Sequence, residues 1–129
     1  MAKLIAALAF ALAVAASFGN AWAQSDIHFG KYHALVIGNN AYRHFDRLKT
    51  AAGDAQAVAE TLKNAYQFNV TLLQDATRDD VMRALADLRR TLAGDDNLLI
   101  YYAGHGVVDQ VTERGYWLPI DAEKDVQTA

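Results

Sequence analysis

The chain has 129 residues, of which 53% are hydrophobic, with a formal net charge of −3 and no cysteine. This length suits a single domain, and the mild charge without a basic cluster gives no reason to expect a nucleic-acid partner. Because no disulfide can form within the chain, the fold must be held together by its apolar core.

The first 23 residues have the pattern of a secretory signal peptide. Lys3 precedes an apolar run from Leu4 to Phe18, and an Ala-x-Ala pattern ends at Ala23. The run is shorter than the roughly 20 residues of a membrane span, although an uncleaved anchor is the alternative. We therefore expect an exported protein, periplasmic or secreted and not attached to a membrane, whose mature domain is residues 24–129 and begins near Gln24.

The mature part opens with a strand, a helix and a second strand. Tyr32 to Gly38 is a short apolar run that stops at the turn signal "GNN". Apolar residues then recur at helical spacing from about Asp54 to Tyr66, where Asp54 suits an N-cap or first-turn carboxylate. Phe68 to Asp75 predicts the second strand.

A second helix is predicted to open at Thr77, with Asp80 three residues later in a spacing related to the capping box. Gly94 is expected to stop it as a C′ glycine. Four apolar residues at helical spacing form its predicted buried stripe: Val81, Leu85, Leu88 and Leu92.

Asn97 to Gly104 is apolar almost throughout, as in a strand covered on both faces. The alternation of strands and helices predicts a parallel, three-layer α/β fold with right-handed crossovers. "GNN" and "GHG" would then both lie at the carboxyl edge of the sheet, where sites form. The tail reads as a hairpin or loop leading into "YWLPIDA", and three strands alone would leave an apolar edge open, so the fold looks incomplete.

One histidine stands apart from the others. His28, His33 and His44 have no partner at a metal-ligand spacing and read as surface or satisfied core residues. His105 lies between two glycines, which leave its backbone uncrowded and able to adopt positive φ, and the amide of Gly106 could face a developing oxyanion. Imidazole is a natural general base for a thiol or hydroxyl nucleophile, but the pattern alone leaves a plain loop histidine equally open.

Four blocks in this order resemble the amino-terminal part of the caspase-like cysteine peptidases of family C14 and clan CD, in their bacterial and metacaspase-type form. The resemblance extends from Tyr32 to Ala122 and implies a three-layer αβα caspase-like fold with a mostly parallel sheet. It also implies peptide or protein substrates. The blocks are "HALVIGNNAY", "LKTAAGDAQAVAETL", "NLLIYYAGHG" and "GYWLPIDA".

The resemblance also implies roles for three residues. His105 matches the catalytic histidine, and Gly106 matches the residue whose backbone N–H helps to form the oxyanion hole. Asp54 matches the acid that selects Arg or Lys in the S1 pocket, while a helix-capping role for it remains an equal alternative. Calcium activation occurs among metacaspases, but no ligand set is recognisable in this sequence, and we expect no metal or other cofactor.

The sequence departs from the family at the nucleophile, which in the family is a cysteine at the end of the next strand. The chain has none, and no Gly-x-Ser-x-Gly elbow replaces it. We expect a fragment of a cysteine endopeptidase, inactive by itself and truncated before the nucleophile strand. The alternatives are a caspase-like pseudoenzyme or protein-binding module and, least favoured, a flavodoxin-like domain, although "GNNAY" is no phosphate loop. The oligomeric state is left open.

Overall fold

The computed structural model describes residues 29–124, and the predicted signal peptide lies outside them. Neither helix in this range is long and apolar enough to span a bilayer. Strands and helices alternate as predicted and are followed by a hairpin. In chain order the elements are β1 (Tyr32–Gly38), α2 (Ala51–Tyr66), β2 (Asn69–Gln74), α3 (Arg78–Thr91), β3 (Asn97–Ala103), β4 (Gly106–Asp109) and β5 (Arg114–Trp117).

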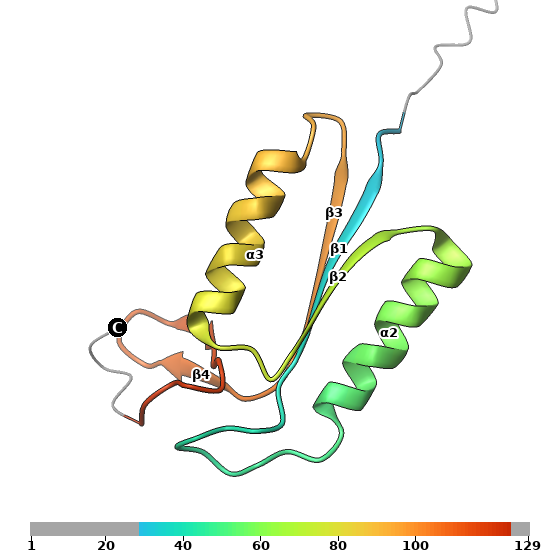
Figure 1. Cartoon of the computed structure of the whole chain (residues 1–129). Helices are drawn as coiled ribbons and strands as arrows, with labels where there is room; N and C mark the ends of the chain where they lie inside the picture. Colours follow the sequence, from blue (N-terminus) through green and yellow to red (C-terminus); the bar gives the residue numbers. More distant parts are fainter. Residues whose placement is uncertain (1–28, 125–129) are drawn as a thin grey trace, which may run out of the picture.

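The three long strands form a parallel sheet in the order β2-β1-β3. Helices α2 and α3 lie on opposite sides of it (Figure 1). Alternate residues of β1 serve the two faces, because Ala34 and Val36 belong to a core cluster with α2 and Leu35 and Ile37 to one with α3. The predicted α/β fold with three layers is therefore confirmed.

Helix α2 begins at Ala51, three residues before the predicted start. Its N-cap residue Thr50 makes no capping bond with its side chain. Asn40, in the "GNN" loop, replaces it, since its Oδ1 accepts a hydrogen bond of 3.2 Å from the Ala52 N–H. A Cβ on Gly38 would lie 2.5 Å from the Ala51 carbonyl oxygen, so the end of β1 and the start of α2 pack backbone to backbone.

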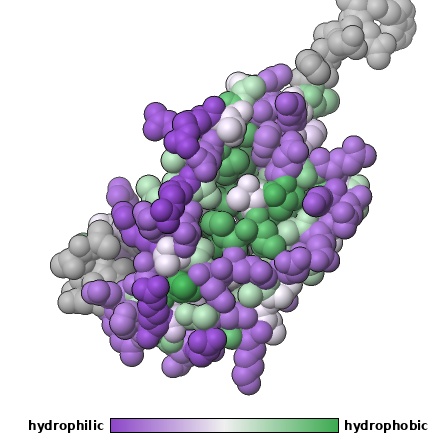
Figure 2. All heavy atoms as spheres, viewed as in Figure 1, coloured by the Kyte–Doolittle hydropathy of each residue, from purple (hydrophilic) through white to green (hydrophobic). Residues whose placement is uncertain are grey.

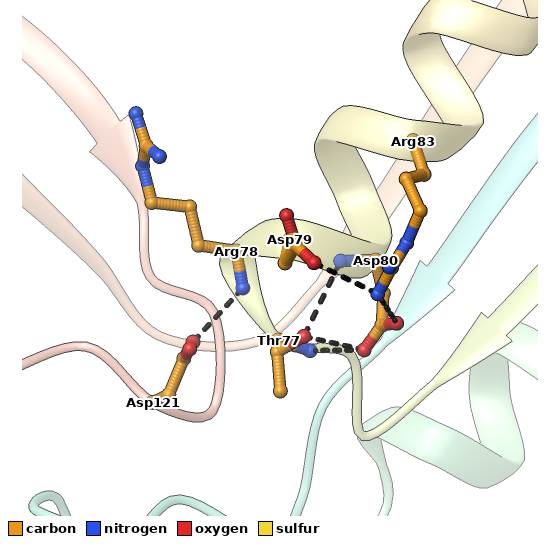
Figure 3. A network of polar contacts seen from close by, with 6 residues as sticks. All are labelled: Thr77, Arg78, Asp79, Asp80, Arg83 and Asp121. Atoms are coloured by element: carbon orange, nitrogen blue, oxygen red, sulfur yellow. Dashed lines mark hydrogen bonds and ion pairs between the residues drawn. The ribbon is translucent and has the colours of Figure 1, made fainter.

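Helix α3 begins as predicted, with a complete capping box (Figure 3). The Thr77 hydroxyl accepts from the Asp80 N–H at 3.3 Å, and the Asp80 carboxylate accepts from the Thr77 N–H at 3.0 Å. The Thr77 hydroxyl also donates to the Asp80 carboxylate at 2.5 Å. This bond, the one from the Thr77 N–H and the nearby Arg83 hold the pKa of Asp80 below its usual value. The predicted stripe of four apolar residues packs in the α3-side core.

The end of α3 differs from the prediction. The C-cap is Leu92, whose extended backbone (φ −70°, ψ 131°) stops the helix two residues before Gly94. Gly94 does not have a positive φ, so its predicted C′ role is wrong. Asp96 organises the turn instead, because its carboxylate accepts hydrogen bonds from the N–H groups of Ala93 and Lys31.

Strand β3 pairs with β1 on one side and has no strand on its other side within residues 29–124. Leu98, Leu99 and Ile100 are 41%, 37% and 40% exposed, so the prediction that this strand is covered on both faces is wrong for the described part of the chain. The predicted open apolar edge is present. In the space-filling view, apolar residues also gather between the two helices, where the sheet is seen edge-on (Figure 2).

The chain returns to the sheet after the antiparallel hairpin of β4 and β5. We call residues 118–121 the return segment. It crosses the carboxyl edge of the sheet and bonds to the loops after β1 and β2 and to the first turn of α3 (Figure 3). The bonds run from Asn39 Nδ2 to the Leu118 carbonyl (3.4 Å), from the Ile120 N–H to Ala76 (3.0 Å), from the Arg43 N–H to Ile120 (2.9 Å) and from the Arg78 N–H to Asp121 (2.9 Å).

Candidate functional site

The sequence-predicted site residues gather at the carboxyl edge of the sheet. Gly38 and Ala103 are register partners at the ends of β1 and β3, and the Asn39 N–H donates to the Ala103 carbonyl at 2.9 Å. His105 therefore follows β3 directly beside the "GNN" loop. Asp54 lies at the same edge, since the first turn of α2 packs on the end of β1. This is the edge at which parallel α/β sheets form their sites.

The His105 imidazole is held by a backbone carbonyl. Its Nε2 lies 2.8 Å from the Asp46 carbonyl oxygen, which can only accept, so Nε2 carries the hydrogen in the neutral ring. The ring also packs against Tyr42 and Phe45, with centroids 4.6 and 6.1 Å away. This tautomer leaves Nδ1 as the basic nitrogen, able to take a proton from a nucleophile.

Two tyrosines hold the main chain of His105. The His105 N–H donates to the Tyr42 hydroxyl at 2.8 Å, and the Tyr102 hydroxyl lies 2.8 Å from both the His105 and the Leu118 carbonyl oxygens. The two hydroxyls are 3.0 Å apart. Burial, and after it the hydrogen bond with Tyr42, raises the pKa of Tyr102 far above its usual value, so Tyr102 stays a protonated donor.

Glycine stands on both sides of His105, and the structure shows what each position requires. Neither adopts the positive φ that a glycine would allow. Gly104 is required by space, because a Cβ there would lie 2.4 Å from the Tyr42 hydroxyl and 2.5 Å from that of Tyr102. Gly106 begins β4 opposite Trp117.

The ladder of the hairpin leaves the Gly106 amide uncommitted. The Leu118 N–H donates to the His105 carbonyl at 3.0 Å, which makes Gly106 and Trp117 a pair of the kind that exchanges no backbone hydrogen bonds. The Gly106 N–H therefore takes no part in the β4–β5 ladder. An oxyanion donor needs an N–H that is free to face the developing charge, and this role of Gly106 stays a prediction.

A cavity of about 670 Å³ opens beside the imidazole. It is lined by Phe45, His105, Gly106, the hairpin residues 107–112, Tyr116, Leu118 and Lys124. Asp54 does not line it. The Asp54 side chain is exposed in the first turn of α2, where a carboxylate interacts favourably with the helix dipole. The residue is not the N-cap, so that part of the capping alternative is wrong. The S1 role of Asp54 stays a prediction.

Of the other histidines in the described part of the chain, neither His33 nor His44 lines the cavity beside His105. His28 lies outside the described residues. His33 is mostly buried on β1, with its Nε2 3.5 Å from the Asp96 carboxylate, and His44 is exposed in the loop after β1. Within residues 29–124 no group of three or more acidic or histidine side chains could hold a metal ion. The described residues therefore offer no side-chain set that fits a calcium ion.

Sequence reasoning missed four groups that shape the site: the Asp46 carbonyl, Asn39, Tyr42 and Tyr102. Asn39 is fully buried, and its Oδ1 accepts from the Ala76 N–H at 2.9 Å, so it joins the ends of β1 and β2. A polar residue directly after a buried strand is a usable signal for such a role. The tyrosines read only as strand and loop residues, and a backbone carbonyl leaves no trace in a sequence.

Comparison with known proteins gives one family match and two distant relatives. A family model described as "Caspase domain" (peptidase family C14) matches residues 31–128. Metacaspase-1 of Pyricularia oryzae is 32% identical over 88 residues, which cover 60% of this chain and 22% of the relative. The human mucosa-associated lymphoid tissue lymphoma translocation protein 1 is 32% identical over 89 residues, covering 69% of this chain and 10% of the relative.

The chain thus spans about a fifth of the fungal relative and a tenth of the human one. The family match itself extends over most of the chain, including every element of the carboxyl edge described above. It agrees with the parallel sheet and the two flanking helices. The chain belongs to the caspase-domain family of peptidases, C14.

Proposed function

We propose that His105 is the acid–base partner of a cysteine nucleophile in an endopeptidase that hydrolyses peptide bonds of peptide or protein substrates. The observation that carries the proposal is the setting of the imidazole. Its Nε2 is engaged by the Asp46 carbonyl, Nδ1 is left as the base, and the adjacent Gly106 N–H lies outside the hairpin ladder. Base and oxyanion donor are thus supplied by consecutive residues at one edge of the sheet.

The proposed reaction has two halves. Nδ1 of His105 takes the thiol proton, the thiolate adds to the scissile carbonyl carbon, and the Gly106 N–H stabilises the resulting oxyanion. The imidazolium then returns its proton to the leaving amine as the carbon–nitrogen bond breaks. Water hydrolyses the thioester with His105 again acting as base.

The nucleophile must come from outside the 129 residues, which contain no cysteine. The exposed apolar strand β3 supports this part of the proposal, because another strand pairing with it would end at the same edge as His105. We also propose export of the protein, on the strength of the amino-terminal pattern before Gln24.

Asp54 is the proposed selector for Arg or Lys before the scissile bond. Its carboxylate is exposed at the functional edge and could pair with a guanidinium or ammonium group. Asp54 does not line the cavity beside His105, so the S1 pocket proposed for it is not that cavity.

The second candidate is a pseudoenzyme or protein-binding module, favoured by the exposed β3 edge, which could pair with an extended segment of a partner. The two candidates make opposite predictions about turnover. Peptide binding without cleavage by the natural protein would support the second.

The decisive variant is His105→Ala in the full natural protein that contains this chain. Turnover of an Arg- or Lys-containing peptide should fall by at least about 10³-fold, because the nucleophile loses its base and the amine its acid. His44→Ala is the control, since His44 is exposed in the loop that also supplies Asp46. A His105→Ala protein that is as active as the His44→Ala protein would rule the proposal out.

Asp54→Asn tests the specificity. We expect kcat/KM to fall by roughly 10-fold or more for substrates with Arg or Lys before the cleaved bond, through loss of a charge-assisted pair. Glu60→Gln, which neutralises another exposed carboxylate of α2, is the control. An equal loss on neutral and basic substrates would favour a purely helix-stabilising role for Asp54.

A further inference from the structure

We infer that Tyr42 and Tyr102 are positioning residues for His105, acting as a two-hydroxyl clamp on its main chain; the inference rests on the proposed function of His105. Each hydroxyl binds one backbone group of the same residue. Tyr42 accepts from the His105 N–H, and Tyr102 reaches the His105 carbonyl, both at 2.8 Å.

The direction of the hydrogen bonds follows from their ends. The His105 N–H can only donate and the two carbonyl oxygens near Tyr102 can only accept. Tyr42 therefore accepts from His105 and gives its own hydrogen to Tyr102, which gives its hydrogen to a carbonyl. Through the Tyr102 bond to the His105 carbonyl, the chain of bonds that leaves His105 at its N–H returns to it at its C=O. Rotation of either peptide group that flanks the His105 Cα would therefore break one of these bonds.

Packing gives the clamp its rigidity. Tyr42 is only 4% exposed, and its ring lies against the His105 imidazole that its hydroxyl helps to place. The Trp117 ring stacks on the Tyr102 ring, with centroids 5.1 Å apart and an interplanar angle of 7°, and so restrains it. Gly104 provides the space in which both hydroxyls meet.

The clamp matters because the imidazole has few other restraints. Its one ring hydrogen bond, to the Asp46 carbonyl, restrains rotation of the ring, whereas the clamp fixes the Cα position from which the ring projects. A displacement of about 1 Å of a reacting group can cost roughly 100-fold in rate. The same bonds align the peptide that carries the Gly106 N–H, so one device serves both proposed catalytic groups.

The test uses Tyr42→Phe and Tyr102→Phe in the full natural protein, which keep both rings and remove only the hydroxyls. We expect kcat to fall at least about tenfold in each while KM changes less than about twofold, because the substrate pocket is kept and the base is misplaced. Together they should cost little more than the worse single change, as expected for groups acting as one unit. Tyr101→Phe is the matched control on the same strand, where the side chain packs toward α2.

His105→Ala separates the two proposals. If it stays active, the proposed function of His105 fails whatever the tyrosine variants do. If it is inactive while Tyr42→Phe and Tyr102→Phe keep the kcat of Tyr101→Phe, the clamp is overturned and the function stands. Where Tyr42→Phe is too unstable to assay, Tyr102→Phe decides alone.

Gly104→Ala gives an independent check. In the wild type its Cβ would press on both hydroxyl oxygens, at 2.4 and 2.5 Å, whereas with both oxygens removed the next neighbour is Tyr102 Cζ at 2.8 Å. Gly104→Ala should therefore lower kcat by a smaller factor in the Tyr42→Phe/Tyr102→Phe protein than in the wild type. An equal factor in both backgrounds would contradict the clamp.

Discussion

Strands β1 and β3 are neighbours with similar apolar sequences, "HALVIG" and "LLIYYA", yet they differ sharply in burial. Leu35, Val36 and Ile37 of β1 are at most 1% exposed, whereas Leu98, Leu99 and Ile100 of β3 are 37–41% exposed. The reason is position in the sheet, since β1 is flanked by two strands and β3 by one within residues 29–124. An apolar run therefore indicates a strand but does not say what covers it.

The largest expected effect compares equal truncations in the two strands. Leu35→Ala should lower the free energy of unfolding by about 2–5 kcal/mol, through lost burial and a cavity, and Leu99→Ala by less than about 1.5 kcal/mol. Urea unfolding of the two variants measures both values. Equal losses of unfolding free energy would contradict the difference in burial between the two strands and mean that β3 is covered in solution.

A smaller effect is expected where β1 ends. Asn39→Ala removes the acceptor for the buried Ala76 N–H and the donor to Leu118, and should cost about 1–3 kcal/mol in unfolding free energy. Asn64→Ala, exposed on α2, is the control and should stay within about 0.5 kcal/mol of wild type. If Asn39→Ala lost no more unfolding free energy than the control, water would hydrogen-bond the Ala76 N–H and the Leu118 carbonyl as well as the Asn39 side chain does.

The smallest effect is expected at the N-cap of α3, which lies at the same carboxyl edge of the sheet. Thr77→Ala should cost about 1 kcal/mol in unfolding free energy. The pKa of Asp80 is lowered in the fold, so its contribution is complete above the ordinary value of 3.8 and is lost as the pH falls through the lowered folded value. The stability difference between wild type and Asp80→Asn should accordingly be constant at neutral pH and shrink in that acid range. A difference independent of pH down to full protonation would exclude an ionic role for this carboxylate.

Local patterns were enough to predict much of this fold. The capping box and the apolar stripe of α3 depend on residues three or four positions apart, which the sequence displays directly. The α2 start was missed because its cap comes from Asn40, ten residues before the helix, and from close packing on Gly38. The end of α3 was missed because Asp96 in the following turn, rather than a glycine conformation, satisfies the chain there.

The candidate site divides in the same way. His105 and Gly106 could be predicted as site residues because their residue types and adjacency match a known chemistry. The family resemblance also includes both positions. The groups that hold His105 could not be predicted. Tyr42 is 63 residues away in sequence, and Asp46 contacts the imidazole only through its backbone carbonyl. Asp54 was found by resemblance, and its location at the edge, outside the cavity beside His105, could not be read from helical spacing.

The return segment has a consequence for synthesis on the ribosome. Its bonds to the edge join residues as far apart as Asn39 and Leu118, which are 79 positions apart. The sheet and helices can assemble from earlier residues, but the loops around His105 are not tied together until Asp121 has left the exit tunnel. Loop closure over such a separation is slow compared with helix formation. A nascent chain would therefore carry a formed core before the loops around His105 are tied together at the edge of the sheet.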